Sequence, residues 1–203
     1  MIRMTTKAGR PRGFDRDAAL DTAMRLFWDK GYDATSIADL TAALGIAAPS
    51  LYAAFGGKRE LFEQSIRHYQ DAGRIEFSAI LDAAPSAREG IARLLRDRAD
   101  DFTDPAHPPG CMVLSAATNC ATPEVATSLR DRRLANTAVV RRRIQRDIDS
   151  GLLDASADAE ALTMYVGAVI QGMSAQARDG ATREQLRGVA AAAMRAWPVA
   201  DAE

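Results

Sequence analysis

The stretch from Thr35 to Phe55 constrains the fold more than any other part of the sequence, because it carries the signals of two short helices joined by a tight turn. Ser36, with Asp39 three residues later, forms a capping-box-like helix start. Gly45 can supply the positive φ that ends a helix, and Pro49 lies where the first turn of a helix tolerates proline. These signals predict a helix-turn-helix whose second helix suits a major groove.

Around this motif, characteristic residues recur at fixed spacing from about Asp15 to Leu61. They are Gly31, Tyr32, Thr35, Ser36, Ile37, Ala38 to Leu40, Leu44, Gly45, Ile46, Leu51, Tyr52, Phe55 and Lys58. This pattern resembles the DNA-binding domain of the TetR family of bacterial transcriptional regulators. The resemblance implies an all-α homodimer that binds a palindromic operator in double-stranded DNA. It also implies release when a small molecule enters the C-terminal domain.

The residues free to contact DNA are those outside the apolar stripe of the motif. We predict Thr35, Ser36, Ala47, Ala48, Ser50 and Tyr52. Alanine offers only a methyl group, which can pack against a thymine methyl, so specificity should depend on Ser50, Tyr52, methyl contacts and DNA shape. The resemblance implies phosphate contacts from Tyr52, from Lys58 and from a helix-start amide near Thr35. The alternative for Tyr52 is a half-buried ring packed on the first helix.

Residues 1–13 are polar, basic and interrupted by glycine and proline, which predicts a flexible basic arm. The net charge of −1 gives no global attraction to nucleic acid, so DNA binding must depend on local positive charge such as this arm. Arg10 and Arg12 flank a proline and resemble the core of peptides that bind a narrow minor groove. The alternative is a solvated tail that only raises solubility.

The expected organisation is a helix-turn-helix domain at 14–57, with a third helix before the motif, and a larger helical effector-binding and dimerisation domain at 58–203. The sequence lacks a run of about 18 apolar residues and the apolar core of a signal peptide, so we expect a cytoplasmic protein with no membrane contact. No motif calls for a cofactor, and the two cysteines and two histidines are too scattered to predict a metal site.

Helical patterns continue through the second domain. Lys58 to Ala83 is expected to form one long helix that connects the DNA-binding domain to the rest. The arginine-rich helix from Thr122 to Gly151 is interpreted as a solvated face, paired with Asp131, Asp147 and Asp149, rather than as a second DNA site. Helices 158–178 and 182–196 are expected to form the homodimer interface, because the first of them is apolar or small on most sides.

The effector is expected to be small and mostly apolar. Plausible lining residues are Phe102, Met112, Leu114, Met164, Tyr165 and Met173.

Cys111 is a candidate redox sensor, because it follows a glycine at an expected helix start, where the helix dipole lowers a thiol pKa. The alternative is a small buried residue, the usual state of a free cysteine. Cys120 is expected on the same helix, too far out of phase to bridge to Cys111.

Two other function classes stand beside a transcriptional regulator. The first is a helical thiol-dependent enzyme using Cys111 with His107, although a loop histidine is more often solvated. The other function class is a purely structural dimerisation module.

Overall fold

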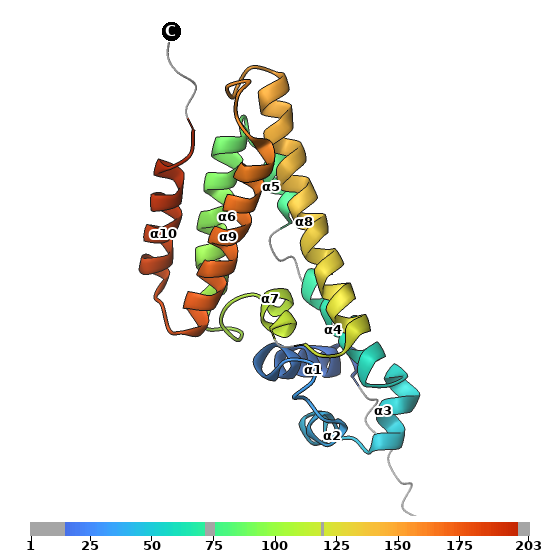
Figure 1. Cartoon of the computed structure of the whole chain (residues 1–203). Helices are drawn as coiled ribbons and strands as arrows, with labels where there is room; N and C mark the ends of the chain where they lie inside the picture. The colour runs from blue at the N-terminus through green and yellow to red at the C-terminus, as the bar shows by residue number, and fades with distance from the viewer. Residues whose placement is uncertain (1–14, 72–75, 119, 199–203) are drawn as a thin grey trace, which may run out of the picture.

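The structure, a computed structural model, describes residues 15–71, 76–118 and 120–198; the arm with Arg10 and Arg12 lies outside them. The described residues form ten helices and no strand, so the predicted all-α class is confirmed (Figure 1). The helices are α1 (Arg16–Lys30), α2 (Ile37–Leu44), α3 (Ala48–Phe55), α4 (Lys58–Asp71), α5 (Phe77–Ala83), α6 (Ala87–Phe102), α7 (Met112–Ala117), α8 (Pro123–Asp149), α9 (Ala159–Arg178) and α10 (Arg183–Arg195).

The helix-turn-helix forms where the sequence predicts it. Ser36 caps α2, and its hydroxyl accepts a hydrogen bond from the Asp39 amide while the Asp39 carboxylate accepts one from the Ser36 amide. Gly45 then adopts a left-handed conformation with φ of 64°, which turns the chain between α2 and α3. The two helices are bent by 90° relative to each other, and α3 carries proline in its first turn.

A first apolar core holds α1 to α4 together at one end of the molecule (Figure 1). Phe27 and Trp28 of α1, Leu40 of α2 and Leu51 of α3 are fully buried in it. Phe62 of α4 meets the Phe27 ring edge-on, with the ring centroids 5.1 Å apart. We call α1 to α4 the reading head, because α4 shares this core although it follows the expected boundary at residues 57 and 58.

The predicted single helix from Lys58 to Ala83 is wrong, because α4 ends at Asp71 and α5 begins only at Phe77. Glu76, just before α5, has the extended dihedrals φ −82° and ψ 115°. Ile80 and Leu81 of α5 are buried against α6 and α8 in a second core. Tertiary packing therefore gives α5 its own position, and local helical periodicity could not reveal that.

The second core joins α5, α6, α8, α9 and α10, and it contains a buried ion pair. Arg143 Nε lies 3.0 Å from Asp147 Oδ1, and both side chains are less than 5% exposed. Arg143 also donates to the carbonyl oxygens of Leu81 and Ala84, and Asp147 accepts from the Ala87 amide. The pair thus holds the turn between α5 and α6 against α8, which corrects the interpretation of all these arginines as a solvated face.

Helix α7 lies between the two cores (Figure 1). Its short length overturns the expectation that Cys111 and Cys120 share a helix, since Cys111 only caps α7 and Cys120 lies beyond its end. Gly110, with φ of 82°, brings the chain against α9, where an added Cβ would stand 2.8 Å from the Ser174 carbonyl oxygen. The Cys111 amide donates to the Ser174 hydroxyl at 2.9 Å. Packing against α9 therefore sets where α7 begins.

Within the described ranges, no single helix has both the length and the apolarity to cross a membrane, whereas α2 and α3 pass that test only as a bent pair.

Candidate DNA-reading surface and effector cavity

The start of α3 forms the exposed surface of the helix-turn-helix. Ala47, Ser50 and Tyr52 are exposed, and Ala48 is partly buried. The Tyr52 side chain is 51% exposed, one of the few large apolar side chains that the described surface leaves in solvent. The predicted contact residues of α3 are therefore at least partly accessible to solvent, and their contacts with DNA stay a prediction.

Thr35 does not belong to that surface. It is completely buried, and its hydroxyl donates to the Gly31 carbonyl oxygen at 2.6 Å. Its amide also has a partner, because it donates to the Tyr32 carbonyl oxygen at 3.2 Å. The prediction of Thr35 as a free DNA-contacting residue is corrected: its polar groups fix the turn between α1 and α2.

Ser36 is exposed, yet its hydroxyl is already hydrogen-bonded within the protein. It donates to Asp39 Oδ2 at 2.6 Å while it accepts from the Asp39 amide. The hydrogen bonds from the Ser36 hydroxyl and amide hold the pKa of Asp39 well below its usual range, and Lys30 Nζ at 3.0 Å adds to this. Ser36 therefore acts first as the cap of α2, and a DNA contact would have to coexist with that cap.

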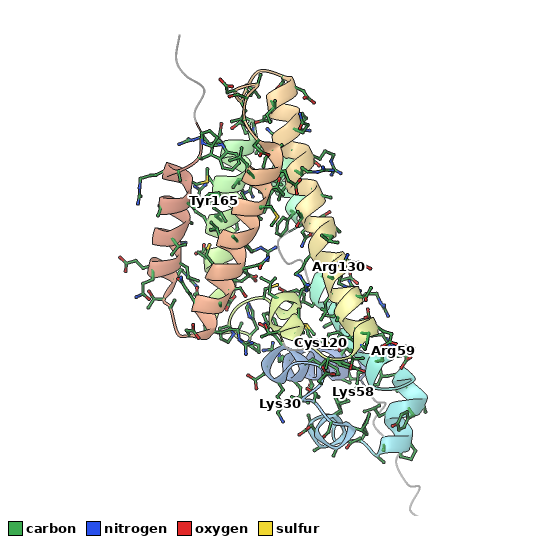
Figure 2. All side chains as sticks on the ribbon, viewed as in Figure 1. Lys30, Lys58, Arg59, Cys120, Arg130 and Tyr165 are labelled. Carbon is green, nitrogen blue, oxygen red and sulfur yellow. The ribbon has the colours of Figure 1, made fainter. Side chains whose placement is uncertain are left out.

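Lys58 is partly buried at the start of α4. Its ammonium lies 4.3 Å from the centre of the Tyr32 ring and 3.5 Å from the Asp33 carbonyl oxygen. Burial lowers the pKa of Lys58, and the nearby Asp33 carboxylate opposes that shift. Arg59, which sequence reasoning missed, is more exposed and lies beside Lys58 in the reading head (Figure 2). Two neighbouring cations thus lie in the reading head, and the contact of Lys58 with DNA phosphates stays a prediction.

The Asp33 carboxylate connects the reading head to the start of α8. It accepts hydrogen bonds from the Ala121 amide at 2.5 Å and from the Thr122 hydroxyl at 2.6 Å. The Thr122 bond is the main reason that the pKa of Asp33 is lowered. The sequence predicts the Thr122 hydroxyl as a cap for α8, but no such cap bond forms because the hydroxyl binds Asp33.

A cavity of about 800 Å³ lies between the two cores. Helices α4, α5, α6, α7, α8 and α9 all contribute to its wall. The lining comprises Tyr69, Gln70, Asp71, Glu76, Phe77, Ala79, Arg98, Phe102, Cys111, Val113, Leu114, Arg133, Asn136, Thr137, Val140, Thr163, Val166, Gly167, Ile170 and Gln171. Its volume suits a small organic molecule.

Of the six side chains predicted to line a pocket, Phe102 and Leu114 border this cavity. The other four lie elsewhere. Met112 and Met173 are fully buried in the two cores, and Met164 is 62% exposed. Tyr165 turns toward α10 and donates to the Ala193 carbonyl oxygen at 3.0 Å (Figure 2). The apolar character of a side chain alone could not show whether it lies in a core, in the cavity wall or at the surface.

Cys111 lines the cavity and is partly exposed. The Tyr69 hydroxyl lies 3.6 Å from its sulfur, and burial raises the Tyr69 pKa, so the phenol stays protonated and donates. Cys120 is also a free thiol, and burial raises its pKa.

His107 is buried, which overturns the expectation of a solvated loop histidine. Its ring stacks on Trp28 with the centroids 4.5 Å apart. Nδ1 lies 2.8 Å from the Pro108 carbonyl oxygen, and Nε2 lies 3.6 Å from Asp101. Both ring nitrogens are thus engaged away from Cys111, so the paired nucleophile and base of a thiol enzyme are not assembled. Within the described ranges, no group of three or more His, Cys, Asp or Glu side chains could hold a metal ion.

Comparison with known proteins agrees with this geometry. The profile of bacterial regulatory proteins of the tetR family matches residues 19–64. The chain is 36% identical over 196 residues to the HTH-type transcriptional repressor ComR of Escherichia coli (strain K12), a match that covers 94% of this chain and 92% of ComR. It is 33% identical over 189 residues to the repressor BdcR of the same strain, covering 91% and 90% of the two chains.

Among solved structures, a cysteine mutant of the TetR family regulator CifR complexed with 26-base-pair operator DNA is 45% identical. The superposition has a TM-score of 0.85 and covers 93% of this chain and all of the CifR chain. A helix-turn-helix joined to a C-terminal helical domain, together with these relatives, defines a DNA-binding transcriptional regulator rather than an enzyme. The chain belongs to the TetR family of bacterial regulatory proteins.

Proposed function

We propose that this protein is a cytoplasmic repressor that binds a palindromic operator as a homodimer and leaves it when a small molecule occupies the cavity. The exposed surface of α3, with Tyr52 half in solvent, is the observation that carries the DNA-binding half of this proposal. The relatives ComR and BdcR are repressors, and the CifR structure contains operator DNA. A palindrome requires a two-fold dimer, since each half-site binds one copy of the reading head.

The dimer is proposed to form through α9 and α10. Met164 is 62% exposed on α9, although it is apolar. On α9, the small residues Ala161, Ala168, Gly172 and Ala175 face solvent near Met164, together with the polar Glu160 and Gln171. On α10, Gly188, Ala191 and Ala192 are also exposed. Small side chains let two helices approach closely, so these faces suit the same faces of a second copy.

Operator binding can be tested by gel shift with the DNA upstream of the protein's own gene. We expect Tyr52→Ala to weaken binding by about tenfold or more, because a hydrogen bond to a charged group such as a phosphate is worth about 1.5–3 kcal/mol. Leu152→Ala is the matched control, since Leu152 is 55% exposed but lies after α8, outside the reading head. Equal losses in both variants, or no binding by the wild type, would reject α3 as the reading helix.

The dimer surface can be tested by analytical ultracentrifugation. Met164→Arg places a charge in the proposed interface and should give monomers at micromolar concentration. Leu134→Arg, on an exposed position of α8, should leave the dimer intact. A Met164→Arg protein that stays dimeric would show that the interface lies elsewhere.

Signal transmission is proposed to pass through α7 and Asp33. Cys111, Val113 and Leu114 line the cavity, whereas Met112 on the same short helix is buried in the core of the reading head. A ligand that shifts α7 would therefore disturb α1, against which α7 packs, and the Asp33 hydrogen bonds beyond it. Such coupling requires that the ligand favour one of two packings.

Oxidation of Cys111 is proposed as a second route of release, favoured by its position in the cavity wall. With a peroxide, the thiolate sulfur would attack one oxygen, the O–O bond would break, and the sulfenic acid would remain while water or an alcohol leaves. We expect peroxide to release wild-type protein and Cys120→Ser from the operator but not Cys111→Ser. Release of the Cys111→Ser protein at the same peroxide concentration would reject this route.

A further inference from the structure

The cavity wall contains two guanidinium groups in different situations. Arg98 is buried and already has partners: Asp101 lies 3.3 Å away, and the aromatic rings of Phe77 and Phe102 lie 5.0 and 5.8 Å from its guanidinium carbon. Its charge is therefore compensated by the protein itself.

Arg133 of α8 is the second guanidinium group, and it lacks such compensation. Its Nη1 atom is shielded from solvent and has no hydrogen-bond partner among the described residues. No described carboxylate pairs with it, although Asp71 and Glu76 also line the cavity. A shielded guanidinium N–H without an acceptor costs free energy, which an oxygen supplied by a ligand would recover.

The neighbours of Arg133 on α8 divide the cavity wall into a polar and an apolar part. Asn136 and Val140 follow at one and two helical turns and line the same cavity. The Thr137 hydroxyl is occupied, because it donates to the Arg133 carbonyl oxygen at 2.9 Å. Arg133 and Asn136 thus offer donors at one end of this stripe. The apolar wall comprises Phe77, Phe102, Leu114, Val140, Val166 and Ile170.

We propose that the effector is a monocarboxylate with an apolar body, bound through its carboxylate to Arg133. A guanidinium matches a carboxylate with two parallel hydrogen bonds, and this geometry makes the contact selective for the charged planar group. The apolar body would lie against Phe102, Leu114 and Ile170. A dianion fits less well, because the carboxylates of Asp71 and Glu76 line the same space and would repel a second negative charge.

This inference rests on the proposed function, since it assigns a ligand class to the proposed effector cavity. Isothermal titration calorimetry of the full chain with octanoate, decanoate and 4-phenylbutyrate, each paired with its neutral amide, tests it. We expect at least one acid to bind the wild type about tenfold or more tightly than its amide, which corresponds to about 1.4 kcal/mol. Amides that bind as well as the acids, or no binding by any of the acids, would overturn the proposal.

Arg133→Gln replaces the guanidinium by a shorter, uncharged amide that can still donate hydrogen bonds, so it should abolish the preference for acid over amide. Arg130→Gln is the matched control, because Arg130 is exposed on the same helix and does not line the cavity. Both variants must retain the wild-type melting temperature and operator affinity. If Arg133→Gln meets this requirement and still prefers the acid, Arg133 is not the anchor.

A gel shift with the same protein preparations tests the proposed function separately from the proposed ligand class. Protein that binds its operator but shows no preference for acids refutes the ligand class alone. Protein that binds no operator refutes the proposed function, whatever the calorimetry shows.

Discussion

The two cores of this molecule differ in what they bury. In the reading head, the buried polar groups among the described residues are the hydroxyl groups of Thr35 and Ser65, the buried tyrosines and the indole N–H of Trp28, and no charged side chain is buried. Beyond α4, the chain buries Arg98, Arg143, Asp147 and His107 and surrounds a cavity of about 800 Å³. A close-packed apolar core has few alternative arrangements, whereas a cavity leaves room for them.

The two regions therefore have different roles in the proposed mechanism. In this mechanism, the reading head holds α3 in one orientation, and the C-terminal helices provide the part whose packing a ligand would change. Helix α7 and Asp33 join the two, since α7 contributes to both cores and Asp33 holds the start of α8.

The largest predicted effect concerns the ion pair in the second core. Arg143→Ala leaves Asp147 buried without its partner and removes two hydrogen bonds to the turn between α5 and α6. We expect the free energy of unfolding to fall by about 3–5 kcal/mol, measured by urea denaturation at fixed protein concentration. Arg142→Ala, at an exposed position, should change it by less than about 0.5 kcal/mol. Similar values for both variants would mean that the pair does not hold the turn.

A smaller effect is expected in the reading head. Thr35→Val removes the hydroxyl that binds the Gly31 carbonyl oxygen, and it should cost about 1–3 kcal/mol of stability. Thr35→Ser retains a hydroxyl and should preserve both most of the stability and operator affinity. If Thr35→Ser folded normally but lost operator binding, Thr35 would contact DNA after all, contrary to its burial.

The smallest effect on stability is expected at Asp33, because the side chain is exposed and solvent screens its interactions. Asp33→Asn should change the free energy of unfolding by less than about 1 kcal/mol. It should nevertheless uncouple the cavity from the reading head, so that ligand binding no longer releases DNA. Calorimetry combined with a gel shift checks this, and an unchanged ligand response would remove Asp33 from the proposed path.

The pH dependence of the Asp33 contact has a defined sign. Because the folded protein lowers the pKa of Asp33, its contribution to stability is fully present above the ordinary aspartate pKa of about 3.9. The contribution is lost as the pH falls through the lowered value in the folded state. The difference between wild type and Asp33→Asn should therefore be constant from pH 5 to 8 and shrink only in stronger acid.

Local signals made much of the fold predictable. Ser36 and Gly45 act within one helical turn, and α2 and α3 form where these residues place them. The separate position of α5, which follows the extended Glu76, and the short α7 depend on packing against distant helices, which the local pattern does not contain.

The residues of the DNA-reading surface and of the cavity were less predictable, because contacts between distant helices decide which side chains are buried. Ser50 and Tyr52 could be assigned to exposed positions of α3, because Leu51 and Phe55 at helical spacing define its buried side. Arg133 and Arg143 could not be separated from the other arginines of α8, since only the positions of α5, α6 and α9 determine which of them are buried. Thr35 was misassigned because its hydroxyl partner, Gly31, belongs to the end of another helix.

The central claim is that two copies of the reading head place α3 in successive major grooves of one duplex. Hydroxyl-radical footprinting of the purified protein on the DNA upstream of its gene tests this most directly. The account predicts two symmetric protected half-sites about one helical turn apart, 34–36 Å between their centres, and Tyr52→Ala should need about tenfold more protein to protect both. A single unsymmetrical footprint, or none, would contradict it.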